Sequence, residues 1–171
     1  MTRQQPDGGG YEAFAAAAGT YGVDTRRVSR EELAGAIDAA VEAPAIGAPL
    51  PFDGVALPAA VTTDPTPAEL SAAATGVTAA SLAIADYGSV VLRAGEHGSE
   101  PISLFTDHHV AVLHEDDIVP DMESAFAWLG GTLRESRDSA IIATGPSATA
   151  DMGALVQGAH GPKTVEVLVV A

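Results

Sequence analysis

The chain contains no cysteine, and this single absence excludes several kinds of site. Without thiols the chain can form neither a disulfide nor a zinc or iron–sulfur site that depends on thiolate ligands. We therefore expect the chain itself to bind no cofactor. Any iron–sulfur cluster that works with this protein belongs to a partner.

Basic residues are also scarce, since the sequence has 8 lysines and arginines against 23 acidic residues, and Lys163 is the only lysine. A formal net charge of -15 opposes binding to nucleic acid, because such proteins neutralise phosphates with lysine and arginine. The acids are spread from Asp7 to Glu166. This spread favours a solvated coat suited to high salt over the alternative, an acidic docking surface for a basic partner.

Long hydrophobic runs are missing as well. No apolar stretch is long enough to cross a bilayer, and residues 1–10 lack the basic start and apolar middle of a signal peptide. We therefore expect a cytoplasmic protein that does not span a membrane. The 171 residues, of which 47% are apolar, can supply the core of one globule of ordinary size.

Two capping boxes mark the starts of helices, at residues 29–32 and 66–69. Further helices are predicted over residues 11–18 and from Pro120 to the pair Gly130-Gly131, which is expected to end the last one. Residues 43–58 contain several prolines and indicate a connector. We therefore divide the chain into an N-terminal helical segment with its connector, residues 1–52, and an α/β domain, residues 53–171.

Strands are predicted around Val90, Val110, Ile141 and Val165, and they alternate with helices. Two of them are continuous apolar runs, which suits strands that are covered on both faces. The pattern predicts an α/β fold with a mostly parallel sheet flanked by helices. In such sheets ligands bind at the carboxyl ends of the strands, where residues 145–151 are then expected.

The loop after the strand around Ile141 is rich in hydroxyls and glycine. Its free backbone N–H groups and its hydroxyls can together hold a carboxylate or a phosphate. In the alternative interpretation, a hydroxyl of this loop merely caps the following turn. The predicted ligand-binding residues of the loop are Thr144, Gly145, Ser147 and Thr149.

A second polar turn precedes the last strand and carries His160 and Lys163. Lys163 is the natural positive partner of a small anionic ligand, and Asp151 and His160 are the candidate catalytic residues. Ser147, Asp151 and His160 follow one another in the order of a hydrolase triad. The short stretch between Ser147 and His160 leaves no room for the elements that bring such a histidine back, so a serine hydrolase is disfavoured.

The remaining histidines offer little support for a metal site. His108 and His109 are adjacent, so on a strand they point to opposite faces and cannot bind one ion together. His114 is out of phase with His109. We predict a solvated strand end here.

Five blocks of the sequence resemble the LUD domain, the family of lactate-utilization protein C. The resemblance covers roughly residues 76–171, and the linked Thr-Gly-Pro-Ser and His-Gly-Pro motifs are its most specific part. The blocks are residues 76–80, 83–92, 118–121, 144–151 and 158–163.

The resemblance implies a fold similar to the NagB/RpiA/coenzyme A transferase superfamily. It also implies a role in oxidising L-lactate to pyruvate with partner proteins that carry iron–sulfur clusters. It adds Asp86, Gly88 and Ser89 to the rim of the site, while Ala148 stands where the family commonly has arginine.

Two other functions stay open at this point. The chain can be a non-catalytic assembly protein that docks on the cluster-bearing partners, or a stand-alone acyl or coenzyme A transfer enzyme with Asp151 as nucleophile. A homo-oligomer is compatible with each of these functions.

Overall fold

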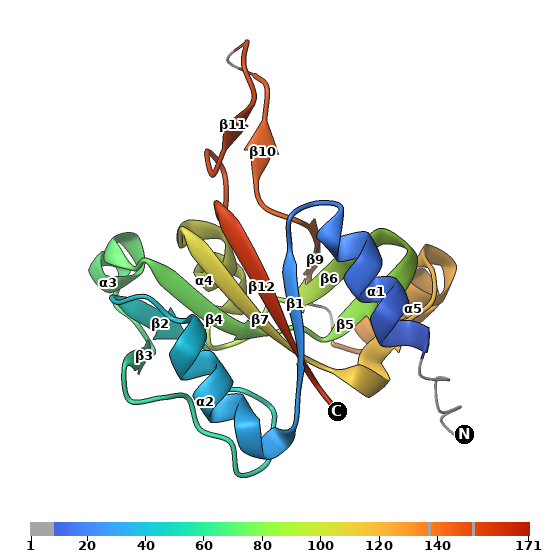
Figure 1. The fold of residues 1–171 in the computed structure, drawn as a ribbon, viewed down its shortest axis with the longest axis horizontal. Helices are drawn as coiled ribbons and strands as arrows, with labels where there is room; N and C mark the ends of the chain where they lie inside the picture. Colours follow the sequence, from blue (N-terminus) through green and yellow to red (C-terminus); the bar gives the residue numbers. More distant parts are fainter. Residues whose placement is uncertain (1–8, 137, 152) are drawn as a thin grey trace.

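The computed structural model of the chain describes residues 9–136, 138–151 and 153–171. Its centre is a six-stranded sheet in which every neighbouring pair of strands is parallel (Figure 1). The predicted α/β class with a mostly parallel sheet is confirmed. The strand order is β3 (Val61–Thr63), β2 (Ala45–Gly47), β4 (Thr75–Ala79), β7 (His108–His114), β12 (Thr164–Val170) and β1 (Asp24–Val28).

The strands β7 and β12 are interior strands of this sheet, and both are apolar on both faces. Residues 109–113 of β7 and 167–170 of β12 are buried, so each strand has cover on two sides. One face packs on α2 (Arg30–Ala40), whose Leu33 and Ile37 share an apolar cluster with Val110 and Leu168. At the β2 and β4 end lie α3 (Pro67–Ala72) and α4 (Ser99–Phe105).

A second, smaller sheet covers part of the opposite face together with α1 (Gly9–Gly19). Val90 and Leu92 from this sheet share a cluster with Ala111 and Val167 of the large sheet. The helix α5 (Met122–Ser136) lies against the second sheet through Ala125 and other apolar residues. The strand order of the second sheet is β8 (Ile118–Val119), β5 (Leu82–Ile84), β6 (Ser89–Arg93) and β9 (Ala140–Thr144). Two short 3-10 helices, η1 (Ala85–Tyr87) and η2 (Glu115–Asp117), precede β6 and β8.

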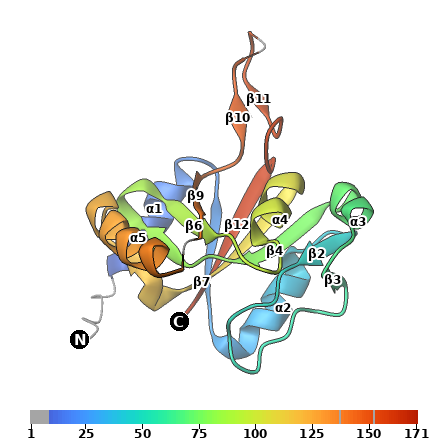
Figure 2. The same cartoon turned by 180° about the vertical axis from the view of Figure 1, so that it is seen from behind.

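Between β9 and β12 the chain leaves the body as a narrow arm, which the structure describes over residues 145–151 and 153–163 (Figures 1 and 2). Its two legs pair antiparallel as β10 (Ala148–Thr149) and β11 (Val156–Gln157). Thr164, which follows the arm, pairs with His108 at the start of β7. The arm therefore stands at the edge where the parallel strands begin.

The predicted location of residues 145–151 at the carboxyl ends of the parallel strands is wrong. The reason is that β9 belongs to the second sheet, where it pairs antiparallel with β6. The end of β9 thus leads to the amino-terminal edge of the large sheet. The prediction failed because it assumed that β9 is a strand of the parallel sheet.

Both predicted capping boxes are confirmed. The hydroxyls of Ser29 and Thr66 accept hydrogen bonds from the N–H groups of Glu32 and Glu69. The expected helix end at residues 130–131 is wrong, because α5 continues to Ser136. Glycine weakens a helix only modestly, and packing of the next turn against the second sheet outweighs this preference.

The segment before residue 53 is more than helices and a connector. It contributes β1 and β2, which pair with β12 and β4 from the rest of the chain. No boundary between separate sheets falls at residue 52. Among the described residues, no helix has both the length and the apolar character needed to span a bilayer.

Candidate functional site

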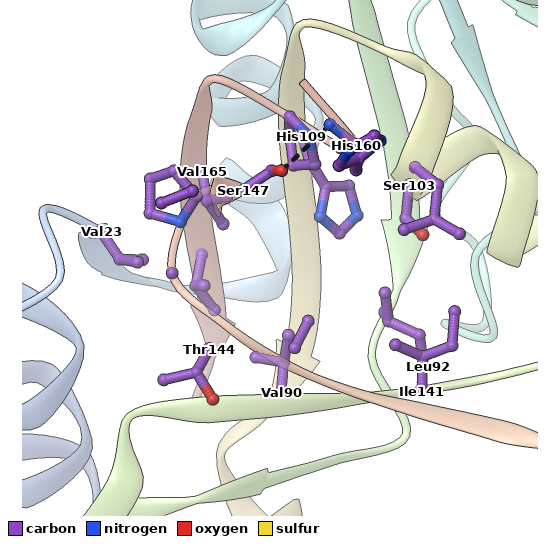
Figure 3. A pocket seen from close by; sticks show the side chains of 18 of the residues that line it. Val23, Val90, Leu92, Ser103, His109, Ile141, Thr144, Ser147, His160 and Val165 are labelled. Carbon is purple, nitrogen blue, oxygen red and sulfur yellow. Dashed lines mark hydrogen bonds between the residues drawn. The ribbon is translucent and has the colours of Figure 1, made fainter. Parts of the chain in front are cut away.

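A cavity of about 290 Å³ opens between the two sheets at the base of the arm (Figure 3). Its wall is largely apolar and comes mainly from β6, β9, β12 and the base of the arm. A small, largely apolar hollow with a few polar groups is the usual form of a ligand site. The polar side chains that line it are Ser103, His109, Thr144, Ser147 and His160.

Thr144 reaches the cavity from the end of β9, where it pairs with Ser89 of β6. The two hydroxyl oxygens lie 2.7 Å apart, and Ser89 is buried. Gly88 has a left-handed φ of 60°, and a Cβ there would collide with the backbone of Ala18. Both conditions require glycine. Thr144 and Gly88 thus line the cavity with Ser89 beside them, whereas Asp86 of η1 is exposed and does not line it.

Ser147 ties the two legs of the arm together at its base. Its N–H donates to the carbonyl of Pro162 at 2.8 Å, and its carbonyl accepts from the N–H of Gly158 at 2.9 Å. Its hydroxyl accepts from the N–H of His160 at 3.3 Å. The N–H of Ser147 is therefore used within the arm, but a hydroxyl that accepts one bond still has a proton to donate. This proton can reach a ligand, since Ser147 lines the cavity.

The chain enters the arm through Gly145, whose φ of 68° is left-handed. A Cβ at this position would lie 2.7 Å from Cβ of Tyr21, so the loop can approach residue 21 only with glycine. Gly145 therefore sets the path by which Ser147 reaches the cavity.

Thr149 and Asp151 lie farther along the arm, and neither lines the cavity. The N–H of Asp151 donates to the Thr149 hydroxyl at 3.4 Å, which is a local turn contact. The Asp151 carboxylate is exposed to solvent. The capping interpretation therefore describes Thr149, and Asp151 does not join the polar groups of the cavity.

Lys163 does not line the cavity. Its Nζ lies 2.8 Å from Oδ2 of Asp107, and both side chains are largely exposed. Exposed pairs of this kind contribute little to stability. No lysine or arginine occurs among the described residues that line the cavity.

Two polar residues of the cavity lining were missed by the sequence interpretation, Ser103 and His109. His109 lies in β7 with only 2% of its surface exposed, so the prediction of a solvated strand end is wrong for this residue. Burial, and to a smaller extent neighbouring His108, lowers the pKa of His109 to about 4, which keeps the imidazole neutral at neutral pH. A signal was available in the sequence: on a strand His109 shares a face with Ala111 and Leu113, and both are buried.

His108 points elsewhere, as the alternation of a strand requires. Its Nδ1 lies 2.7 Å from the hydroxyl oxygen of Thr164 on the neighbouring strand. In the part of the chain that the structure describes, no group of three or more histidines and carboxylates is placed to hold a metal ion.

Fold and site together define an α/β protein in which a second sheet folds over one face of a parallel sheet and encloses a ligand-sized cavity. The LUD domain family matches residues 55–170, and the chain belongs to this family. The resemblance inferred from the sequence motifs is thereby confirmed.

Curated relatives carry one common name. The chain is 34% identical over 161 residues to lactate utilization protein C of Deinococcus radiodurans, a match that covers 88% of this chain and 74% of that protein. It is 36% identical over 91 residues to lactate utilization protein C of Bacillus velezensis, covering 51% of this chain and 38% of that protein. The chain thus spans well under half of the Bacillus relative.

A solved structure has a similar fold along the whole chain. The crystal structure of a DUF162 family protein from Deinococcus radiodurans matches with a TM-score of 0.75 and 25% sequence identity. The match covers 100% of this chain and 99% of that one. The similarity includes the N-terminal residues that lie outside the LUD domain match.

Proposed function

We propose that this chain takes part in lactate utilization and binds a small carboxylate, such as lactate or pyruvate, in the cavity at the base of the arm. The relatives named lactate utilization protein C support the pathway. The cavity supports the size of the ligand, because its volume of about 290 Å³ lies at the lower end of the range of ligand sites.

The main support for the proposal is that Thr144, Ser147 and His160 line the same largely apolar cavity. The Ser147 hydroxyl can donate to a carboxylate oxygen, and hydrogen bonds to charged acceptors are roughly twice as strong as neutral ones. The hydrocarbon part of the ligand then packs on the apolar wall, which includes Val90 and Val165.

Isothermal titration calorimetry with lactate and with pyruvate tests this proposal. Ser147→Ala removes a hydrogen bond to a charged group and should weaken binding about tenfold. The matched control is Ser71→Ala on α3, an exposed serine far from the cavity lining, and it should bind as the unaltered chain does. Unaltered binding in Ser147→Ala would exclude this site.

The arm favours a second function of a different class, docking on partner subunits that carry iron–sulfur clusters. A two-stranded hairpin is marginal in water by itself, and this one projects from the body (Figures 1 and 2). Leu155 on the arm is 74% exposed. Large apolar side chains on a projecting element favour contact with another protein.

Co-elution in size-exclusion chromatography with purified iron–sulfur subunits of a lactate-oxidising system tests the docking function. Leu155→Glu should abolish co-elution, whereas Ala154→Glu places the same charge on an exposed neighbour and should weaken it less. If both variants co-elute like the unaltered chain, the arm is not the docking element. Light scattering on the same column reports whether the chain forms a homo-oligomer.

A further inference from the structure

We propose that His109 is held in the tautomer protonated at Nδ1 and donates this N–H to an acceptor oxygen of the ligand, a carboxylate or keto oxygen of a small organic acid. The inference rests on the proposed ligand site and adds a specificity-determining residue to it. It is carried by the geometry of one buried side chain.

The imidazole of His109 is almost fully buried and projects into the cavity (Figure 3). Its Nε2 lies 2.8 Å from Oγ1 of Thr78 in β4, a residue with 0% exposure. Its Nδ1 has no hydrogen-bond partner among the described residues. Nδ1 of His109 is not among the fully buried side-chain atoms that lack a hydrogen-bond partner, so it remains accessible. Because His109 lines the cavity, this access is from the cavity.

The bond to Thr78 determines which ring nitrogen carries the proton. If Nε2 were protonated, the Thr78 oxygen would accept, and its own hydroxyl proton would need another acceptor. In the described part of the chain, His109 is the only hydrogen-bond partner of the Thr78 hydroxyl. A buried donor left without an acceptor is costly, so Thr78 donates to Nε2 and the ring proton resides on Nδ1.

The cavity therefore presents neutral donors from two sides. His109 offers Nδ1–H from the start of β7, and Ser147 offers its hydroxyl from the base of the arm. The low pKa of His109 keeps the ring from becoming an imidazolium at neutral pH. The Nδ1–H of His109 can only donate, so it selects ligands that place an acceptor oxygen there, because a ligand donor facing Nδ1–H would leave both protons unpaired.

Nitrogen-15 NMR of the full chain labelled at histidine tests the assignment directly, with pyruvate as the probe. The signals of His109 are those lost in His109→Gln, and His108→Gln is the matched control. We expect Nδ1 of His109 to be protonated and Nε2 unprotonated at neutral pH. On addition of pyruvate the Nδ1–H signal should shift with the same dissociation constant that calorimetry gives.

The variant Thr78→Val gives a second test, because the tautomer ratio of His109 would not change if Thr78 only filled space. Valine has nearly the shape of threonine but removes the proton donor to Nε2. His109 should then populate both tautomers, and pyruvate binding should weaken about three- to tenfold.

The outcomes separate this inference from the proposed function. A proton on Nε2 in the unaltered chain, or pyruvate binding that leaves the His109 signals unchanged, overturns the role of His109 and leaves the ligand site standing. The absence of any pyruvate or lactate binding by calorimetry overturns the ligand site, and the role of His109 with it.

Discussion

Mild acidification should destabilise this protein through the buried imidazole of His109. The pKa of His109 is about 4 in the folded chain and 6.5 for an unperturbed histidine. Above pH 6.5 neither the folded nor the unfolded chain binds a proton at this residue. Below pH 6.5 the unfolded chain binds a proton that the folded chain does not, so the free energy of unfolding falls with pH and levels off near pH 4.

The size of this effect follows from the shift in pKa. One pKa unit corresponds to roughly 1.4 kcal/mol, so the loss should reach about 2 kcal/mol at pH 5 and about 3 kcal/mol at pH 4. Hydrogen bonds lower the pKa of four exposed carboxyls, whose contributions are lost only below about pH 4.5. The range between about pH 6.5 and 5 therefore separates the effect of His109 from that of these four carboxyls. The four carboxyls are those of Glu32, Glu69, Asp121 and Asp138.

Urea unfolding near pH 7.5, 6 and 5 at constant salt measures the effect. His109→Gln removes the titrating ring, so its stability should fall with acid by about 2 kcal/mol less than that of the unaltered chain. His108→Gln keeps the buried ring of His109, so its free energy of unfolding should fall with acid as much as that of the unaltered chain. Parallel pH curves for the unaltered chain and His109→Gln would refute the reasoning, whatever their offset.

Gly88→Ala should destabilise the chain by several kcal/mol, because φ is 60° and the new methyl group meets the Ala18 backbone. Gly22→Ala, with φ of 74° and open space around it, should cost only about 1 kcal/mol; equal losses in urea would contradict the packing role of Gly88. Ser29→Ala removes the cap of α2 and should cost about 1 kcal/mol in the same assay, and no measurable loss would contradict the cap. The melting temperature should rise with potassium chloride, because salt screens the repulsion within a chain of net charge -15; a flat or falling curve would contradict the interpretation of the acidic surface.

Helix starts could be predicted here because capping acts within one turn of the chain. Ser29 and Thr66 each bond a glutamate three positions later, and no distant residue is needed. The strand β1 escaped prediction because it is a polar edge strand, with the sequence Asp-Thr-Arg-Arg-Val. Its pairing with β12 comes from main-chain bonds to the other end of the chain.

In the candidate site, too, some residues could be predicted from the sequence and others could not. The motif resemblance selected Thr144, Ser147 and His160, and the structure brings these three to one cavity. Asp151 and Lys163 belong to the same motifs, yet the arm directs them into solvent or toward Asp107. Distance along the chain does not show which side of a projecting hairpin a side chain occupies.

By itself the sequence determined the α/β class, the LUD family, the capped helices and the absence of thiol chemistry, because each of these depends on residue type or on neighbours within a few positions. The tertiary structure alone decided that β9 joins a second sheet and that His109 becomes a buried, neutral group facing a cavity. Both depend on segments distant in sequence. The pairing of β9 with β6 and the bond between Thr78 and His109 exist only once distant strands have joined one sheet, and the burial of His109 needs the contacts of the folded chain.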